Sequence, residues 1–94
     1  MQFLIQTSRS PEFESGVSPT ALRSEETQLR NLYAAQIVRQ IWHRRDRPGA
    51  VMLVEADDEA HAEQSAMSLP LVRAGLVTID AITPLKPYAG FCRD

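Results

Sequence analysis

Residues 37–56 read IVRQIWHRRDRPGAVMLVEA, and the architecture of the chain can be worked out from them. Branched and aromatic side chains are frequent in 37–44 and again in 50–56, a composition typical of β-strands. The polar segment 45–49 between them contains Pro48 and Gly49, residues that favour a turn. These features predict two antiparallel strands joined as a hairpin.

The sequence on either side of the hairpin predicts a strand and a helix before it, and a helix and a strand after it. Ser18 followed by Pro19 is a typical helix start, because the hydroxyl caps the first turn and proline fits the first helical position. Pro70 and Pro84 are expected to end the second helix and the last strand. The expected elements are a strand over 2–7, a polar loop over 8–17, a helix from 19 to 34 or 35, a helix from 57 or 58 to about 68, a loop over 71–75 and a strand over 76–83.

This order of elements, β-α-β-β-α-β, predicts an α+β fold of the ferredoxin-like type. Both helices would lie on one face of a four-stranded antiparallel sheet. The other face would be uncovered, and with Trp or Ile side chains on it would be a poor surface for a monomer. We therefore expect a homodimer in which two sheets pack face to face and enclose a cavity. Trp42, or the arm around Tyr88 and Phe91, is expected to be buried between the subunits.

Length and composition predict one small globular domain. The chain has 94 residues, 44% hydrophobic and 23% charged, so we expect a single domain over 1–94 with 85–94 as an extended C-terminal arm. A formal charge of −2 argues against nucleic acid or an anionic membrane as a partner. Because no apolar run is long enough for a signal peptide or a membrane span, we expect a cytoplasmic protein. The single cysteine, Cys92, fits a reducing compartment.

Standard catalytic and nucleotide-binding motifs are absent from the sequence. With two histidines and one cysteine, neither a structural zinc site nor other metal chemistry is expected. A functional site would therefore be assembled from side chains that are scattered along the chain.

Two carboxylates of the first helix lie on or beside its apolar stripe. One face carries, at helical spacing, Leu22, Glu26, Leu29 and Tyr33. Glu25 lies on the flank of that face. Either both glutamates face solvent near the start of the helix, or one borders a pocket in which loss of water raises its pKa toward that of a general base. Arg23 could then pair with this carboxylate or hold a substrate.

The strand before the turn carries a second group of candidate residues. If side chains alternate strictly, Arg39 and His43 lie on one side of the strand, and Trp42 and Arg44 lie on the other. One interpretation is structural, with Trp42 in a core or interface and the charged residues in solvent. The other is functional: an arginine binds a carboxylate or a developing enolate, and His43 carries a proton near neutral pH. On the last strand, Asp80 faces either solvent or a cavity opposite an arginine.

Several segments carry a family resemblance: residues 32–56 with Arg39 and Trp42, the helix end Ser68-Leu69-Pro70-Leu71, the first-helix stretch 22–29, and the opening with Met1 and Phe3. In these residues and in total length, the chain resembles the muconolactone delta-isomerase family. The resemblance implies a ferredoxin-like subunit, a dimeric α/β barrel and a higher, ring-shaped assembly. It also implies a cofactor-free reaction, in which an allylic proton shift moves the double bond of a small carboxylated lactone during aromatic-compound breakdown.

The implied chemistry needs a base for the carbon acid, stabilisation of the dienolate and a cation for the substrate carboxylate. The expected catalytic residues are Glu26, or its neighbour Glu25, and His43. The expected substrate-binding residues are Arg23, Arg39, Trp42 and Arg44. The sequence departs from the family's pattern at 43–49, at 73–75 and in a longer tail over 84–88. Because these segments would lie near a pocket mouth, the identity of the substrate stays open.

Two other functions stay open. One is a non-catalytic small-molecule binding or accessory protein of the same dimeric α/β barrel type. The other is a cofactor-free oxygenase or dehydratase, because a fold of this kind does not fix its chemistry.

Overall fold

The computed structural model describes residues 1–92, and the side chains of residues 1–90. In chain order the elements are β1 (Gln2–Arg9), α1 (Phe13–Gly16), α2 (Pro19–Ala34), β2 (Val38–His43), β3 (Ala50–Glu55), α3 (Glu59–Met67), α4 (Pro70–Arg73), β4 (Val77–Leu85) and the 3-10 helix η1 (Ala89–Cys92). Among the described helices, none combines the length and the apolar character that crossing a membrane requires.

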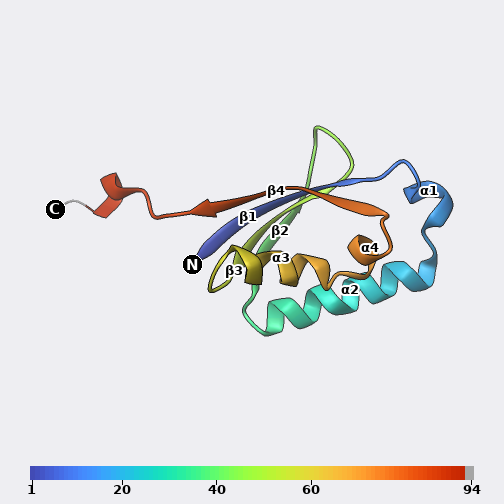
Figure 1. Ribbon diagram of the computed structural model, residues 1–94, viewed down its shortest axis with the longest axis horizontal. Helices are drawn as coiled ribbons and strands as arrows, with labels where there is room; N and C mark the ends of the chain where they lie inside the picture. Colours follow the sequence, from blue (N-terminus) through green and yellow to red (C-terminus); the bar gives the residue numbers. More distant parts are fainter. Residues whose placement is uncertain (93–94) are drawn as a thin grey trace.

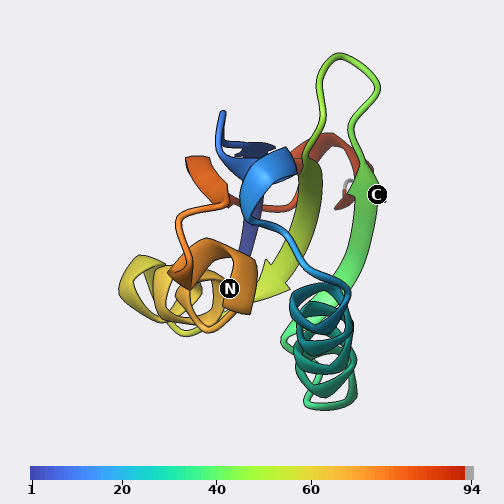
Figure 2. The same ribbon diagram turned by 90° about the vertical axis from the view of Figure 1, so that its right-hand side faces the viewer.

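The four strands form one antiparallel sheet in the order β2-β3-β1-β4. Helices α2, α3 and α4 lie together on one side of the sheet, and the described helices leave its other face uncovered (Figures 1 and 2). The expected hairpin is present, with Trp42 opposite Val51 and His43 opposite Ala50. This is the ferredoxin-like βαββαβ arrangement, so the predicted fold class is confirmed.

The two long helices begin at the residues that the sequence indicates. Ser18 accepts a hydrogen bond from the backbone N–H of Ala21 at 3.1 Å, and Pro19 occupies the first helical position. Asp58 caps α3 in the same way by accepting from the N–H of His61 at 2.8 Å. These caps satisfy backbone donors that a helix start leaves unpaired.

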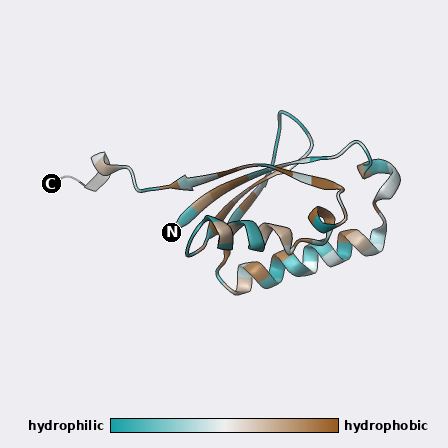
Figure 3. Ribbon diagram, in the orientation of Figure 1, coloured by the Kyte–Doolittle hydropathy of each residue, from teal (hydrophilic) through white to brown (hydrophobic). Residues whose placement is uncertain are grey.

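The main hydrophobic core lies between the sheet and the helices. Alternate residues of β1, Phe3 and Ile5, are almost fully buried there, and Ala62 and Ala66 let α3 approach closely. A second, smaller cluster at the α1 end joins Phe13, Leu71 and Leu76. Figure 3 shows hydrophobic stretches along the strands, with hydrophilic residues prominent along α2 and in the β2–β3 turn.

Several expected boundaries were wrong. The loops predicted over 8–17 and 71–75 contain short helices, α1 and α4. In α4, Pro70 occupies the first helical position, so it starts this helix as well as following the end of α3. β4 continues through Pro84, which is tolerated because β4 is at the edge of the sheet. The predicted extended arm includes η1, and the side chain of Phe91 lies outside the described residues.

Candidate functional site

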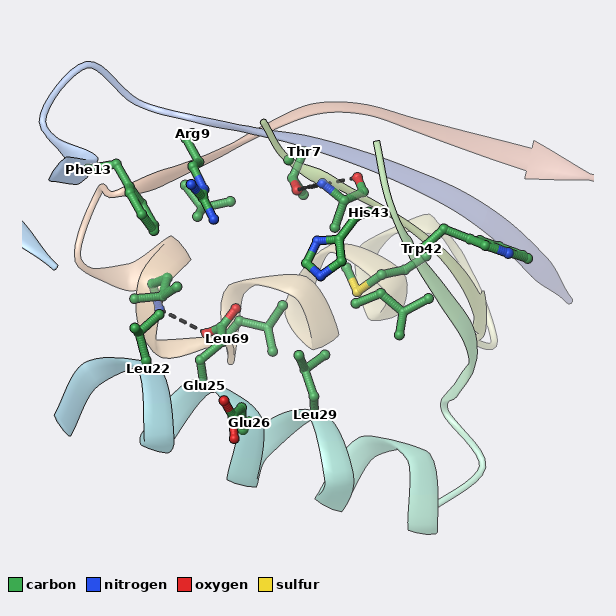
Figure 4. A pocket seen from close by; sticks show the side chains of 16 residues that line it. Thr7, Arg9, Phe13, Leu22, Glu25, Glu26, Leu29, Trp42, His43 and Leu69 are labelled. Carbon is green, nitrogen blue, oxygen red and sulfur yellow. Dashed lines mark hydrogen bonds between the residues drawn. The ribbon is translucent and has the colours of Figure 1, made fainter. Parts of the chain in front are cut away.

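A pocket of about 360 Å³ lies between α2 and the sheet, close to α1 and α4 (Figure 4). This volume is at the lower end of the range for small-molecule sites, about 300–1,000 Å³. Apolar side chains form much of its wall, among them Leu22, Leu29, Met52, Leu69, Leu71 and Val77. The ionisable side chains that line it are Arg9, Glu25, Glu26 and His43. It therefore has the apolar wall and few polar groups typical of a site for a small organic ligand.

Glu25 is the carboxylate that α2 directs into this pocket (Figure 4). Its Oε1 accepts a hydrogen bond from the backbone N–H of Leu71 at 3.0 Å. That N–H is available because Leu71 lies in the first turn of α4, where helical amides have no partner within the helix. Burial raises the pKa of Glu25, and the hydrogen bond from Leu71 partly opposes this rise. The result is a fixed carboxylate with increased basicity.

Glu26 contributes to the pocket only at its rim. Its side chain is 63% exposed and forms an ion pair with Arg30 at 3.5 Å, one turn further along α2. A side chain so exposed keeps its water, which Glu25 partly loses. The spacing of the apolar stripe in the sequence did not separate the two glutamates, whereas their burial does.

His43 lines the pocket from the end of β2, opposite the helix that carries Glu25 (Figure 4). The pairing of β2 with β3 is irregular, because Val38 lies opposite Val54 but Gln40 lies opposite Leu53. This shift at Arg39 interrupts the strict alternation assumed for the strand. Beyond it, His43 faces the helices, while the indole of Trp42 points away from the pocket centre (Figure 4).

Arg23 and Arg39 lie outside the residues that line this pocket. Arg23 is exposed on α2 and donates from Nη2 to the hydroxyl of Thr20 at 3.4 Å. Arg39 is exposed at the irregular position of β2. Within one subunit, neither arginine joins Glu25 and His43.

Arg44 follows the end of β2 and joins three segments of the chain. Its guanidinium donates to Asp46 at 3.0 and 2.7 Å, to Asp80 at 3.1 Å and to the carbonyl oxygen of Thr7 at 3.2 Å. Asp80 in turn accepts from the hydroxyl of Ser8 at 2.9 Å. Arg44 lowers the pKa of Asp46 by hydrogen bonding to it. The sequence suggested that Asp80 could face an arginine across a cavity. Asp80 does pair with Arg44, but the pair lies outside the pocket.

Arg9 and Phe13, which line the pocket beside α1, were not predicted from the sequence. The guanidinium carbon of Arg9 lies 4.1 Å from the centre of the Phe13 ring. Alternation in β1 could have indicated Arg9, because Phe3, Ile5, Thr7 and Arg9 share one side of a strand. Phe13 had no such signal, since α1 was expected to be part of a loop.

A metal site is not formed by the part of the chain that the structure describes. Among these residues, no group of three or more histidine, cysteine, aspartate or glutamate side chains is arranged to hold a metal ion. The chemistry that the pocket itself offers is acid–base chemistry between a carboxylate and an imidazole.

The chain has a likeness to a solved enzyme structure. No family model matches the chain, and no curated protein matches it by sequence. Among solved structures, it is similar to 5-chloro-2-hydroxyhydroquinone dehydrochlorinase (TftG) from Burkholderia phenoliruptrix AC1100, in complex with 2,5-dihydroxybenzoquinone. The TM-score is 0.71 at 18% sequence identity, and the match covers 96% of this chain and 98% of that chain. The two chains share one fold.

Proposed function

We propose that this protein is an enzyme that shifts a proton, and with it a double bond, in a small oxygenated ring compound such as a carboxylated lactone. The observation that carries the proposal is the half-buried Glu25, held by the Leu71 amide in a largely apolar pocket that His43 also lines. A general base with a raised pKa removes a proton from carbon more effectively than an ordinary surface carboxylate.

In the proposed reaction, the Glu25 carboxylate takes a proton from the allylic carbon of the ring. The electron pair of the broken C–H bond moves toward the carbonyl oxygen and forms a dienolate, whose charge a hydrogen bond from His43 stabilises. Glu25 then returns the proton at the other end of the conjugated system. One C–H bond breaks, one forms and the double bond moves, so the step needs no oxidant, reductant or cofactor.

Two comparisons support this proposal. The sequence resembles the muconolactone delta-isomerase family, whose reaction is such a proton shift. The fold is shared with TftG, a dehydrochlorinase whose structure holds a dihydroxybenzoquinone. Both point to small oxygenated ring compounds of aromatic catabolism as the substrate class.

A dimer is part of the proposal. Trp42 is among the residues that line the pocket, but it is 48% exposed. It pairs with Val51, which pairs with Gln6 next to the core residue Ile5, so alternation places the Trp42 side chain on the face of the sheet away from the core. An exposed indole on such a face favours burial against a second copy of the chain. We propose that Trp42 lies in this interface at the edge of the pocket. If Trp42 binds substrate, it does so only in the dimer, where the second subunit covers its side chain.

The experiment that tests the function is incubation with muconolactone in deuterated buffer, with the allylic protons followed by NMR. Glu25→Gln should reduce exchange and isomerisation by about 10²–10⁴-fold, the usual contribution of a general base. Glutamine keeps an oxygen that can accept from Leu71, so the fold should persist. Glu26→Gln is the matched control, because it removes a neighbouring but exposed carboxylate, and its rate should stay within about threefold of the wild type.

Two results would contradict the proposal. If Glu25→Gln exchanges protons as fast as the wild type while remaining folded, Glu25 is not the base. If Glu26→Gln abolishes exchange and Glu25→Gln does not, the roles of the two carboxylates are reversed.

A second candidate function, a non-catalytic binding protein, is favoured by the largely apolar wall of the pocket. Such a protein would be stabilised by ring compounds in proportion to ligand concentration, without turnover. Thermal unfolding with 2,5-dihydroxybenzoquinone and with muconolactone distinguishes the two functions. A concentration-dependent rise in Tm without exchange in deuterated buffer would favour binding alone.

A further inference from the structure

Arg9 is the arginine that β1 brings to the pocket. Its backbone N–H donates to the carbonyl oxygen of Pro48 at 3.0 Å, which fixes the end of the strand. Its guanidinium lies over the ring of Phe13, a buried residue of α1. Figure 4 shows Arg9 beside Phe13 at the α1 end of the pocket, and the Arg9 side chain is 43% exposed. The cation–π contact favours a guanidinium position over the ring.

The donors of this guanidinium are available to a ligand. Among the side chains that the structure describes, its ion pair is with Glu14 at 3.9 Å, too long for a hydrogen bond, and Glu14 is 88% exposed. A stacked arginine keeps its in-plane N–H groups free for bidentate contact with a carboxylate or a similar oxyanion. Arg44, by contrast, already uses its donors on Asp46, Asp80 and Thr7.

We propose that Arg9 binds the anionic group of the substrate and so makes this pocket selective for negatively charged ring compounds. This inference rests on the proposed function, because the role of Glu25 as the base sets where the reacting carbon lies. With the anionic group at Arg9, beside α1, the ring lies on the apolar wall and its reacting carbon faces Glu25 and His43. In this proposal Arg9, in place of Arg23, Arg39 or Arg44, is the cation that binds the anionic group.

The charges around the pocket are compatible with this assignment. Glu26, at the rim, is already paired with Arg30. Glu25 accepts a hydrogen bond from Leu71, so part of its negative charge is compensated by the protein. A second, outer hollow of about 330 Å³ shares Arg9 and Phe13 with the pocket and is also lined by Ser10, Glu14 and Arg47. An anion could reach Arg9 from either side, and the test must distinguish the two.

The test compares benzoate with benzamide, a neutral compound of nearly the same shape, in NMR titrations of ¹⁵N-labelled full-length protein. The wild type should bind benzoate more tightly than benzamide. Arg9→Gln should weaken benzoate binding about tenfold or more and leave benzamide binding unchanged, because only the anion loses a charged partner. Arg9→Lys, which keeps the charge without the planar fork, should retain part of the preference. Arg23→Gln and Arg73→Gln, which alter exposed arginines outside the pocket, should bind both probes as the wild type does.

The inference is overturned if the wild type shows no preference for benzoate, if Arg9→Gln weakens both probes equally, or if the preference is lost in Arg23→Gln instead. It is also overturned if benzoate shifts the amides of Ser10 and Arg47 but not those of Glu25 and Leu71, because the anion would then occupy the outer hollow. Failure of the proposed reaction is seen separately. A protein that prefers benzoate through Arg9 but exchanges no lactone protons would keep the anion site and lose the isomerase function.

Discussion

Gly49 ends the β2–β3 turn where the chain passes closely over β1. We predict that replacing Gly49 by alanine destabilises the protein, by an amount that follows from the distances at this crossing. A Cβ at this position would lie 2.1 Å from the carbonyl oxygen of Thr7 and 2.8 Å from the Cα of Ser8. Ordinary contacts begin near 3.4 Å, so the backbones must separate by about 1.3 Å. Both opposing atoms belong to a backbone within the sheet, and no flexible side chain can absorb the movement.

The expected cost combines overpacking with lost hydrogen bonds. Overpacking of this kind costs about 1–3 kcal/mol. Separation also weakens the bonds from Arg9 N–H to Pro48 and from Ala50 N–H to the Thr7 hydroxyl, each worth about 1 kcal/mol. We therefore expect Gly49→Ala to lower the free energy of unfolding by about 3 kcal/mol and Tm by roughly 12–24 °C in a domain of this size.

Urea denaturation and calorimetry measure this effect, and Gly75→Ala is the matched control. Gly75 has φ +77°, but a Cβ there would meet nothing within 4 Å. Its replacement should cost only the backbone strain, about 1 kcal/mol. If Gly49→Ala is no less stable than Gly75→Ala, the turn does not pass over β1 as closely as the structure indicates. Because Gly49 also lines the pocket, such a result would remove support for the shape of that wall.

Three further predictions test the site and its surroundings. Because burial raises the pKa of Glu25, the folded protein binds the proton of this carboxyl group more tightly than the unfolded chain does, and the stability that this proton contributes is lost as pH rises through the raised pKa. Glu25→Gln should remove that part of the pH dependence when the free energy of unfolding is measured against pH, and an unchanged profile would refute the prediction. Thr7→Val should cost about 1–3 kcal/mol in urea denaturation, since the buried hydroxyl is the partner of the Ala50 N–H, and a neutral change would show that this N–H finds another acceptor. The wild type should sediment as a dimer at micromolar concentration and Trp42→Asp as a monomer; a monomeric wild type would exclude the proposed interface.

The order of strands and helices could be predicted from the sequence because the signals for it are local. The hairpin follows from two β-rich runs around Pro48 and Gly49. The first helix start follows from Ser18, whose side chain bonds to the backbone amide three residues ahead. For the second helix the sequence left Asp57 or Asp58 open, and the structure shows that Asp58 is the cap. The short helices α1 and α4 were missed because four residues carry too weak a periodic pattern to be distinguished from a loop.

The sequence could name Glu25 and Glu26 as candidates but could not distinguish between these two neighbours. Helical spacing places Glu25 and Glu26 beside one apolar stripe, and only the docking of α4 on α2, which brings the Leu71 amide to Glu25, separates them. The side of β2 on which Arg39 lies could not be predicted from strict alternation, because the register of β2 with β3 shifts between Val38 and Gln40. Such a shift depends on the partner strand and not on the local sequence.

The four strands and the two longer helices, in their order along the chain, follow from the sequence, since periodicity, caps and turn residues act over a few neighbouring positions. Which ionisable groups share the pocket follows from the packing of distant segments. Arg9 and Phe13 meet Glu25 and His43 because α1 and β2 approach α2 from different parts of the chain. Arg44 meets Asp80 outside the pocket, across 36 residues of sequence. Burial and the resulting pKa of a side chain depend on such distant neighbours, and no local pattern encodes them.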